Sequence, residues 1–372
     1  MMPDLEKMIT LEVTDHCNLK CKMCTQANTN EPHGTPKGFM SLETWKSFIN
    51  GLKYFEGITT LTPFWVGESL LNPEFLSMLD YAFHKNEVNQ LFDTVTINTN
   101  GILLDEKGSR KILELSALKN QNESTMRRIH FSLDANSPLT FKIIKGKDYF
   151  NVVRNNILKF LKLRGKSKFP KITIALIVMK ENKNEVKDFL EYWTHVLKKY
   201  NEEIEITWDW PKKMLDTIYI RRLDDWENQA KAEMLHKETI KKLGLINEGG
   251  KRIIRTNSVL GFEEDNVRKP CPGLWRTPII HRNGDVSVCC FDILMKNVIG
   301  NVNKTPLGEL WDSDLINKWR LAHIKGEFDK AAPLCKTCGN LFGPELTDEH
   351  VRSWLKETGR QEMIEGYNQR IK

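Results

Sequence analysis

Short segments rich in Ile, Val and Thr alternate with longer amphipathic segments through the first 210 residues of this 372-residue chain. Such an alternation predicts repeated β/α units, in which each crossover helix returns the chain to a parallel strand. The expected strands are 8–14, 58–66, 92–98, 127–133, 171–179 and 203–209, and the expected helices are 42–55, 73–86, 105–119, 148–165 and 183–200. Six units predict an α/β fold whose parallel sheet curls into a (β/α)6 barrel or part of one, with functional residues at the carboxyl ends of its strands.

Composition narrows the class of protein. Apolar residues make up 40% of the chain, and no apolar run approaches the ~20 residues of a membrane-spanning helix. The N-terminus lacks the apolar core of a signal peptide, so we expect a cytoplasmic protein without a membrane partner. The net charge of +6 comes from 55 basic and 49 acidic residues, without a basic stripe interleaved with aromatics, so nucleic acid is not an expected partner.

The eight cysteines fall into two groups, at 17–24 and 271–338, with 246 residues between them that contain none. Because the cytosol keeps thiols reduced, such cysteines are better explained as metal ligands than as disulfides. Disulfide pairing also gives no reason for the gap, whereas two ligand clusters do.

Cys17, Cys21 and Cys24 follow the predicted first strand in the run Val13-Thr-Asp-His-Cys-Asn-Leu-Lys-Cys-Lys-Met-Cys24. Three thiolates on one loop can hold three corners of a four-iron cluster and leave the fourth iron open to a small molecule. The alternatives are three incidental thiols or a zinc knuckle completed by His16 or His33, although the three-residue gap is unusual for zinc.

This C-x3-C-x2-C loop resembles that of the radical S-adenosylmethionine (SAM) enzymes, which carry it after the first strand of an open six-stranded barrel. The resemblance implies that the open iron chelates the amine and carboxylate of SAM. An electron then cleaves SAM to a 5′-deoxyadenosyl radical, which abstracts hydrogen from the substrate. It also implies an electron donor such as flavodoxin or ferredoxin.

The segment after the second predicted strand, Trp65-Val-Gly-Glu68, resembles the Gly-Gly-Glu segment of the same family, with Val66 in place of the first glycine. The resemblance implies close backbone approach at Gly67 and an acceptor for the SAM ammonium group at Glu68. The structural alternative for Glu68 is an acid at a helix N-terminus.

Polar residues follow the third and fourth predicted strands as well. Asn98-Thr-Asn-Gly101 is similar to the family's Thr-Asn-Gly, which makes Asn100 an expected cofactor contact, although a plain turn is the alternative. Ser132 and Asp134, on one side of a strand, are expected to meet the ribose or the methionine carboxylate, and a capping pair is the alternative. Local basic groups that favour an anionic substrate or cofactor carboxylate are Lys142, Lys145, Lys147, Arg221 and Arg222.

The second cysteine group is built from three segments. Asn283-Gly284 between alternating apolar residues predicts a β-hairpin that brings Cys271 toward Cys289 or Cys290. A helix over about 306–322 then returns the chain, so that Cys335 and Cys338 supply two more thiolates. Four such thiolates can enclose an iron–sulfur cluster or a structural zinc.

This second group resembles the SPASM or twitch extension of many radical SAM enzymes, which holds auxiliary clusters. Five cysteines suffice for one auxiliary [4Fe–4S] cluster, and family spacing favours Cys271, Cys289, Cys335 and Cys338 as its ligands. Adjacent residues of a strand face opposite ways, so Cys289 and Cys290 are not expected to ligate together. Cys290 is then a buried small hydrophobe or, in an epimerase, a hydrogen-atom donor.

The expected organisation is a radical SAM partial barrel (1–210), a bridging region (211–268) with a helix near 223–243, a small α+β auxiliary-cluster domain (269–345) and a C-terminal helix (346–372). A single auxiliary cluster is similar to that of radical dehydrogenases of sugars or aminocyclitols. The leading hypothesis is therefore an oxidoreductase acting on a small polar substrate. The alternatives are a radical epimerase, a peptide or protein maturase, and a zinc-binding interaction module without enzymatic activity.

Overall fold

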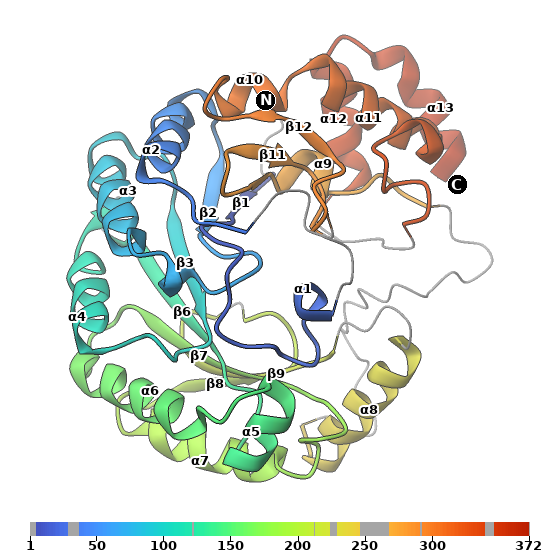
Figure 1. Ribbon diagram of the computed structural model, residues 1–372. Helices are drawn as coiled ribbons and strands as arrows, with labels where there is room; N and C mark the ends of the chain where they lie inside the picture. The colour runs from blue at the N-terminus through green and yellow to red at the C-terminus, as the bar shows by residue number, and fades with distance from the viewer. Residues whose placement is uncertain are drawn as a thin grey trace.

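The computed structural model describes residues 5–28, 37–120, 123–211, 213–223, 229–245, 268–290, 292–338 and 346–371. A curved sheet with helices along its outer side dominates the view in Figure 1. Its ten described strands lie in the order β12-β11-β10-β1-β2-β3-β6-β7-β9-β8. The fold is mixed α/β with a parallel sheet, consistent with the predicted partial barrel.

The strands agree in position with all six predictions and add several that were not predicted. Their bounds are β1 Lys7–Leu11, β2 Ile58–Thr62, β3 Thr94–Thr99, β4 Lys119–Asn120, β5 Glu123–Ser124, β6 Met126–Ser132, β7 Lys171–Ile177, β8 Ile204–Thr207, β9 Asp216–Arg221, β10 Ile279–Ile280, β11 Asp285–Ser287 and β12 Val298–Asn301. Strands β1, β2, β3, β6, β7, β9 and β8 are all parallel to their neighbours in that sequence.

The described helices are α1 Thr25–Asn28, α2 Leu42–Gly51, α3 Phe75–Asn89, α4 Glu106–Leu115, α5 Pro138–Lys145, α6 Phe150–Arg164, α7 Val186–Lys198, α8 Gln229–Lys242, α9 Gly273–Arg276, α10 Leu307–Trp311, α11 Asp314–Lys325, α12 Asp348–Glu357 and α13 Ile364–Ile371. Of these, α2, α3, α4, α6 and α7 lie along the outer side of the sheet (Figure 1). Helix α5 was not predicted, and the helix expected over 306–322 is divided into α10 and α11. The C-terminal helix is likewise divided, into α12 and α13.

The two faces of the sheet differ in chemistry. Alternate residues such as Ile97, Ile129 and Ile218 are buried in the core shared with the helices. Because side chains alternate across a strand, the residues between them point to the inner face of the curve. Those positions hold polar residues, among them Asn98 and His130. The core therefore lies outside the curve, and its inside is left to polar groups.

Strand β9 extends the sheet beyond residue 210, into the region expected to bridge the domains. It lies between β7 and β8 and pairs with both in parallel. Asp216, at its start, is fully buried and forms a two-bonded ion pair with Arg164 of α6, with both N–O distances at 2.7 Å. The sequence analysis missed this strand because it begins with a charged residue, Asp216. The residue that neutralises Asp216 lies 52 positions away in the chain, so a local pattern does not reveal the pair.

The C-terminal unit joins the same sheet. Strand β10 pairs in parallel with β1, and β11 and β12 follow as antiparallel strands. The predicted hairpin is confirmed: it turns through Asn283-Gly284, and Gly284 has φ +89°, which glycine adopts without strain. No helix in the described part of the chain is long and apolar enough to cross a membrane.

Candidate cluster and cofactor site

The loop with Cys17, Cys21 and Cys24 follows the carboxyl end of β1. Its backbone rests on the end of α5, since Lys20 N donates to Lys145 O (3.3 Å) and Lys22 N donates to Ile144 O (2.8 Å). Cys24 N donates to Cys21 O (3.0 Å), which turns the loop so that these two cysteines share one bend. Backbone contacts on both sides of Cys21 thus set the position of the loop.

Buried polar residues before the loop hold its entry. Asp15 accepts from Gly38 N (2.8 Å) and lies 3.0 Å from the Arg282 guanidinium, which comes from the turn after β10. Thr14 donates to Gly38 O (2.7 Å) and accepts from His16 N (3.0 Å). The chain on both sides therefore fixes the path of the residues that lead into Cys17.

Gly67 and Glu68 lie directly against this entry. Gly67 has φ +85°, and a Cβ there would lie 2.5 Å from Thr14 O and 2.7 Å from His16 O. Glu68 N donates to His16 O (2.8 Å). Only glycine lets the β2 loop approach the cysteine loop this closely. The approach of Gly67 to SAM, which the resemblance implies, stays a prediction.

The Glu68 carboxylate joins the second and third strand ends. It accepts from Thr99 Oγ1 (2.8 Å), Asn100 N (2.7 Å) and Leu70 N (3.3 Å), the last as a cap of the short turn Ser69–Leu71. Burial raises the pKa of Glu68, although these hydrogen bonds oppose that rise. The capping alternative thus describes part of its role, and its contact with an ammonium group stays a prediction.

Asn100 also reaches the cysteine loop. Its side-chain NH2 donates to Asn18 Oδ1 (2.7 Å), and its Oδ1 accepts from Ile102 N (3.0 Å). Asn18 lies between Cys17 and Cys21, and the sequence analysis did not single it out. The structure therefore brings Asn100 to the predicted site through a residue of the loop itself.

Ser132, Asp134 and Lys145 form a compact polar group after β6. Asp134 Oδ2 accepts from Ser132 Oγ (2.8 Å) and from Lys145 Nζ (2.5 Å), and Asp134 Oδ1 accepts from Ile177 N (2.7 Å). Strand β6 ends at Ser132 and Asp134 has φ +61°, so a left-handed turn rather than strand alternation brings the two together. Against the effect of its burial, Asp134 raises the pKa of Lys145, which keeps the ammonium charged.

Three thiols on one loop are the donor type that an iron–sulfur cluster takes, and burial favours the neutral form of two of them when no cluster is bound. Burial raises the pKa of Cys21 to about 11, and it raises the pKa of Cys17 as well, while the nearby Lys145 opposes both shifts. All eight cysteines lie in the described residues, and none forms a disulfide. In the described ranges, no three His, Cys, Asp or Glu side chains lie close enough together to hold a single metal ion.

The second cysteine group comes together from the predicted segments. The pKa of Cys271 is raised to about 12, mainly by burial and also by repulsion from the nearby Cys335 and Cys338. The pKa of Cys335 is also raised to about 12, mainly by burial and next by repulsion from the nearby Cys289. Cys271 N donates to His323 Nδ1 (3.2 Å) on α11, a contact that sequence reasoning missed.

Cys289 and Cys290 are not separated by strand alternation. Strand β11 ends at Ser287, so both cysteines lie in the turn beyond it. The thiol of Cys290 is near Cys289, Cys271 and Cys338. The geometric reason for choosing one over the other therefore fails, and the assignment of Cys289 stays a prediction.

The inner face of the sheet carries further polar side chains that the sequence analysis did not assign. His130 on β6 stacks on Trp210 (centroids 6.4 Å apart, 11° between planes) and meets Tyr219 edge-on (6.2 Å). Arg128 donates to Thr173 Oγ1 (2.6 Å) and Thr217 Oγ1 (3.1 Å) deeper in the curve. The sequence did contain a sign of this polar face. Parallel strands are ordinarily apolar on both faces, whereas these strands carry polar residues at every second position.

Burial and, after it, the nearby Arg221 charge together lower the pKa of His130 to about 3. Asn98 on β3 pairs in register with His130. Its buried Oδ1 has no hydrogen-bond partner within the described residues. The inner face thus offers a neutral imidazole, an unused amide oxygen and nearby cationic groups.

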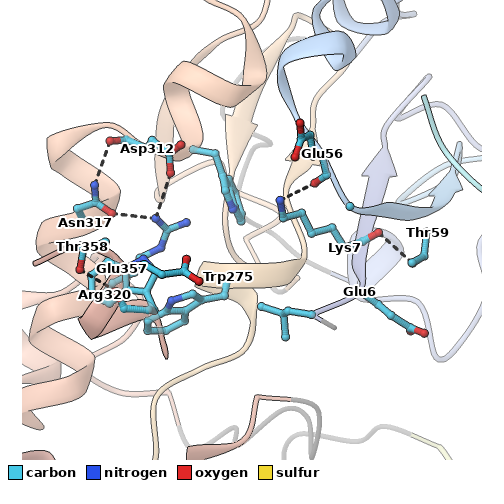
Figure 2. Close-up of a pocket in the computed structure, with 14 residues that line it drawn as sticks. Glu6, Lys7, Glu56, Thr59, Trp275, Asp312, Asn317, Arg320, Glu357 and Thr358 are labelled. Carbon is cyan, nitrogen blue, oxygen red and sulfur yellow. Dashed lines mark hydrogen bonds and ion pairs between the residues drawn. The ribbon is translucent and has the colours of Figure 1, made fainter. Parts of the chain in front are cut away.

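Figure 2 shows a separate cavity of about 830 Å³ at the opposite, N-terminal edge of β1 and β2. Lys7 and Arg320 face each other across it. The Arg320 guanidinium lies 5.5–5.9 Å from the ring centroids of Trp275, Trp311 and Trp354. None of the predicted site residues lines this cavity.

Two family models match the chain. The model of the radical SAM superfamily matches residues 11–192, and the model of the SPASM iron–sulfur cluster-binding domain matches residues 271–339. These ranges contain all eight cysteines and every predicted site residue.

Two curated proteins illustrate the relationship. The tungsten-containing aldehyde ferredoxin oxidoreductase cofactor-modifying protein of Pyrococcus furiosus is 22% identical over 326 residues, which cover 83% of this chain and 81% of the relative. The GTP 3′,8-cyclase of Desulforamulus reducens is 28% identical over 157 residues, 42% of either chain.

Solved structures share the fold. Native anSMEcpe with bound AdoMet superposes with a TM-score of 0.57 at 16% identity, covering 97% of this chain and 99% of that one. Streptococcus suis SuiB gives a TM-score of 0.54 at 15% identity, covering 85% of this chain and 67% of that one.

Proposed function

We propose that this chain, which belongs to the radical SAM superfamily and carries a C-terminal SPASM domain, is an oxidoreductase that acts on a small polar molecule. It is an enzyme, and its two domains imply a [4Fe–4S] cluster that binds SAM together with an auxiliary iron–sulfur cluster. When bound, these groups supply a 5′-deoxyadenosyl radical that removes a hydrogen atom and an acceptor for the second electron.

The proposed ligands follow from the two cysteine groups. Cys17, Cys21 and Cys24 would hold the SAM-binding cluster, because their loop is held against α5 and the β2 loop by backbone contacts. One auxiliary cluster would be held by the second group, for which the proposed set is Cys271, Cys289, Cys335 and Cys338. The proposed domains remain 1–210, 211–268, 269–345 and 346–372, with β9 joining the sheet of the first.

Residues around the cysteine loop would orient SAM. Gly67 brings the β2 loop against the cysteine loop, and Glu68 keeps a carboxylate at the end of β2. Asn100 and Ser132 contribute hydrogen-bonding groups at the next strand ends. Asp134, fully buried, would act through Lys145, whose ammonium it holds near Cys21.

The polar inner face is the observation that carries the substrate class. Asn98 Oδ1 is an acceptor without a partner in the described residues, His130 remains neutral at physiological pH, and Trp210 is 57% exposed beside it. A hydroxyl or amide group would satisfy Asn98, since buried polar groups are ordinarily paired. The relative that matches most of this chain is named a cofactor-modifying protein, which also supports a small molecule as substrate.

The test is a screen of metabolites against release of 5′-deoxyadenosine by anaerobically reconstituted protein with dithionite as reductant. A substrate should yield one 5′-deoxyadenosine for each product molecule that has lost two hydrogens. The variant Asn98→Leu should lose the response to substrate but keep uncoupled SAM cleavage. A product that has the mass of the substrate in ordinary water and gains one deuterium in heavy water would replace oxidation with epimerisation, with Cys290 as the candidate donor.

A further inference from the structure

Reductive cleavage of SAM requires an electron from outside the protein, and one face of the molecule is suited to receive its carrier. We propose that the outer face of α5, together with the adjoining cysteine loop and the loop after β7, is the docking surface for a flavodoxin. This inference rests on the proposed cluster at Cys17, Cys21 and Cys24. One electron would pass from the reduced flavin to the cluster, with no transfer of atoms.

Helix α5 is the element that lies directly behind the cluster loop. The hydrogen bonds from Lys20 N to Lys145 O and from Lys22 N to Ile144 O bracket Cys21 against its last turn. A Cβ on Gly146 would lie 2.9 Å from Lys20 O, so the two backbones are in contact. A carrier bound to the outer side of α5 is thus separated from the loop by about one helix diameter, roughly 10 Å.

The outer face of α5 is apolar where solvent would be expected. Leu139 is 69% exposed and Ile143 is 49% exposed, and the spacing of four residues places them on one side of the helix. Val152, 43% exposed, lies at the start of the neighbouring α6. Their inner counterparts Phe141 and Ile144 are fully buried, so the core does not need the two outer residues.

Positive charge surrounds this apolar pair. The exposed lysines of α5, the cysteine loop and the loop after β7 are Lys20, Lys22, Lys142, Lys147, Lys180 and Lys183. The carboxylates in the same segments are the exposed Asp148 and the half-buried Glu181, which is paired with Lys22 at 2.6 Å. Glu185 turns inward and accepts from Ser137 and Thr140 at the start of α5 (2.6 Å each).

The exposed apolar pair and the lysines around it together favour one class of partner. An apolar patch with a basic rim complements a protein that exposes an apolar redox group within a ring of carboxylates, which is the surface that a flavodoxin presents around its flavin edge. Opposite charges across such a contact raise the association rate and fix the orientation, and salt weakens them. Lys145 takes no part in this surface, because its side chain is 3% exposed and is paired with Asp134.

Two measurements test the docking surface. The first is the Kd of purified flavodoxin for the chain, measured without SAM or turnover; the second is 5′-deoxyadenosine release driven by reduced flavodoxin or by dithionite. The double variant Lys142→Glu/Lys147→Glu should raise the Kd at least about tenfold at low salt and slow flavodoxin-driven cleavage correspondingly, because charge reversal opposes steering. Lys142 and Lys147 are exposed, so of the basic groups on this segment only the buried Lys145 is kept as part of the cofactor site. Dithionite-driven cleavage should remain unchanged in the double variant, since a small reductant needs no docking surface.

The matched control is Lys159→Glu/Lys162→Glu, which makes the same change of charge on the far half of α6. It should leave both the Kd and the flavodoxin-driven rate near those of the unmodified chain. The variant Leu139→Ser/Ile143→Ser should raise the Kd while preserving its dependence on salt. Equal effects of the two lysine pairs, or tight binding of a ferredoxin in place of flavodoxin, would overturn the proposal. Absence of dithionite-driven cleavage in the unmodified chain would instead refute the proposed function.

Discussion

Glu12 Oε2 and His281 Nδ1 lie 3.0 Å apart although 269 residues separate them in the chain. Both side chains are fully buried, and they stand just past the ends of β1 and β10, which pair in parallel. His281 Nε2 also meets Ser287 Oγ (2.9 Å). Cys17 follows Glu12 by five residues and Cys289 follows Ser287 by two, so this contact fixes the two cysteine groups relative to each other.

The triple variant Cys17→Ala/Cys21→Ala/Cys24→Ala should abolish 5′-deoxyadenosine formation. It removes every thiol of the first group and none of the second, so bound iron should fall from about eight to about four per chain. Iron and sulfide analysis with measurement of SAM cleavage checks both outcomes. Undiminished cleavage would refute the assignment of this loop.

Cys335→Ala should reduce substrate turnover more than SAM cleavage, because the auxiliary site acts after the radical forms. Cys290→Ala is its control: if Cys290 is no ligand, iron content stays at about eight per chain. The iron content of Cys290→Ala also decides between Cys289 and Cys290 as the ligand, because it should fall only if Cys290 is the ligand. Equal loss of cleavage and turnover in Cys335→Ala would assign the second site a structural role.

Gly67→Ala should destabilise the protein by more than about 2 kcal/mol and impair SAM cleavage, since strained left-handed backbone alone costs 1–3 kcal/mol. The added methyl group would also clash with Thr14 O at 2.5 Å. The control Gly359→Ala has a similar φ of +71° but no atom within 4 Å of the new Cβ. It should cost about 1–2 kcal/mol in chemical unfolding and leave SAM cleavage intact.

Arg164→Met should lower the free energy of unfolding by about 3–5 kcal/mol, because it leaves the Asp216 carboxylate buried without its counter-charge. Asp216 also accepts from Ile172 N (2.9 Å), so the loss should reach the pairing of β7 with β9. Lys111→Met, which removes a surface ion pair with Asp80, should cost less than about 1 kcal/mol. Similar losses in the two variants would show that Asp216 is accommodated without Arg164.

Stability should decline as pH falls below the ordinary histidine pKa of 6.5, partly because of His130. Its pKa is lowered to about 3 in the folded protein, so only the unfolded chain gains a proton there between those values. The contribution of His130 should fall by roughly 1.4 kcal/mol between about pH 7.5 and 5.5. Urea titrations at several pH values should show that the free energy of unfolding of His130→Gln declines less steeply with falling pH. An identical decline in the two proteins would mean that His130 is protonated in the folded state as well.

Local patterns predicted the elements that carry their own signals. Short segments rich in Ile, Val and Thr located all six expected strands, and the Asn283-Gly284 pair located the hairpin. The start of α3 was placed two residues early, because Glu74 rather than Asn72 is its N-cap. The Asn72 side chain accepts from Glu74 N (2.9 Å) and donates to Val13 O (2.9 Å) and Met40 O (3.0 Å), so that it anchors the end of β1. A local pattern cannot reveal such a contact, because its partners are distant in sequence.

The spacing of Cys17, Cys21 and Cys24 and the presence of a second thiol group were enough to predict two metal-cluster sites, because ligand type and spacing can be read along the chain. Tertiary structure alone decided that Lys145 turns inward while Lys142 stays outside, that Asp216 opens a strand, and that β10 lies beside β1. The difference lies in how far apart along the chain the interacting residues are. Ligand type and spacing are local properties of the chain, whereas burial of a charge depends on a partner that only folding brings near.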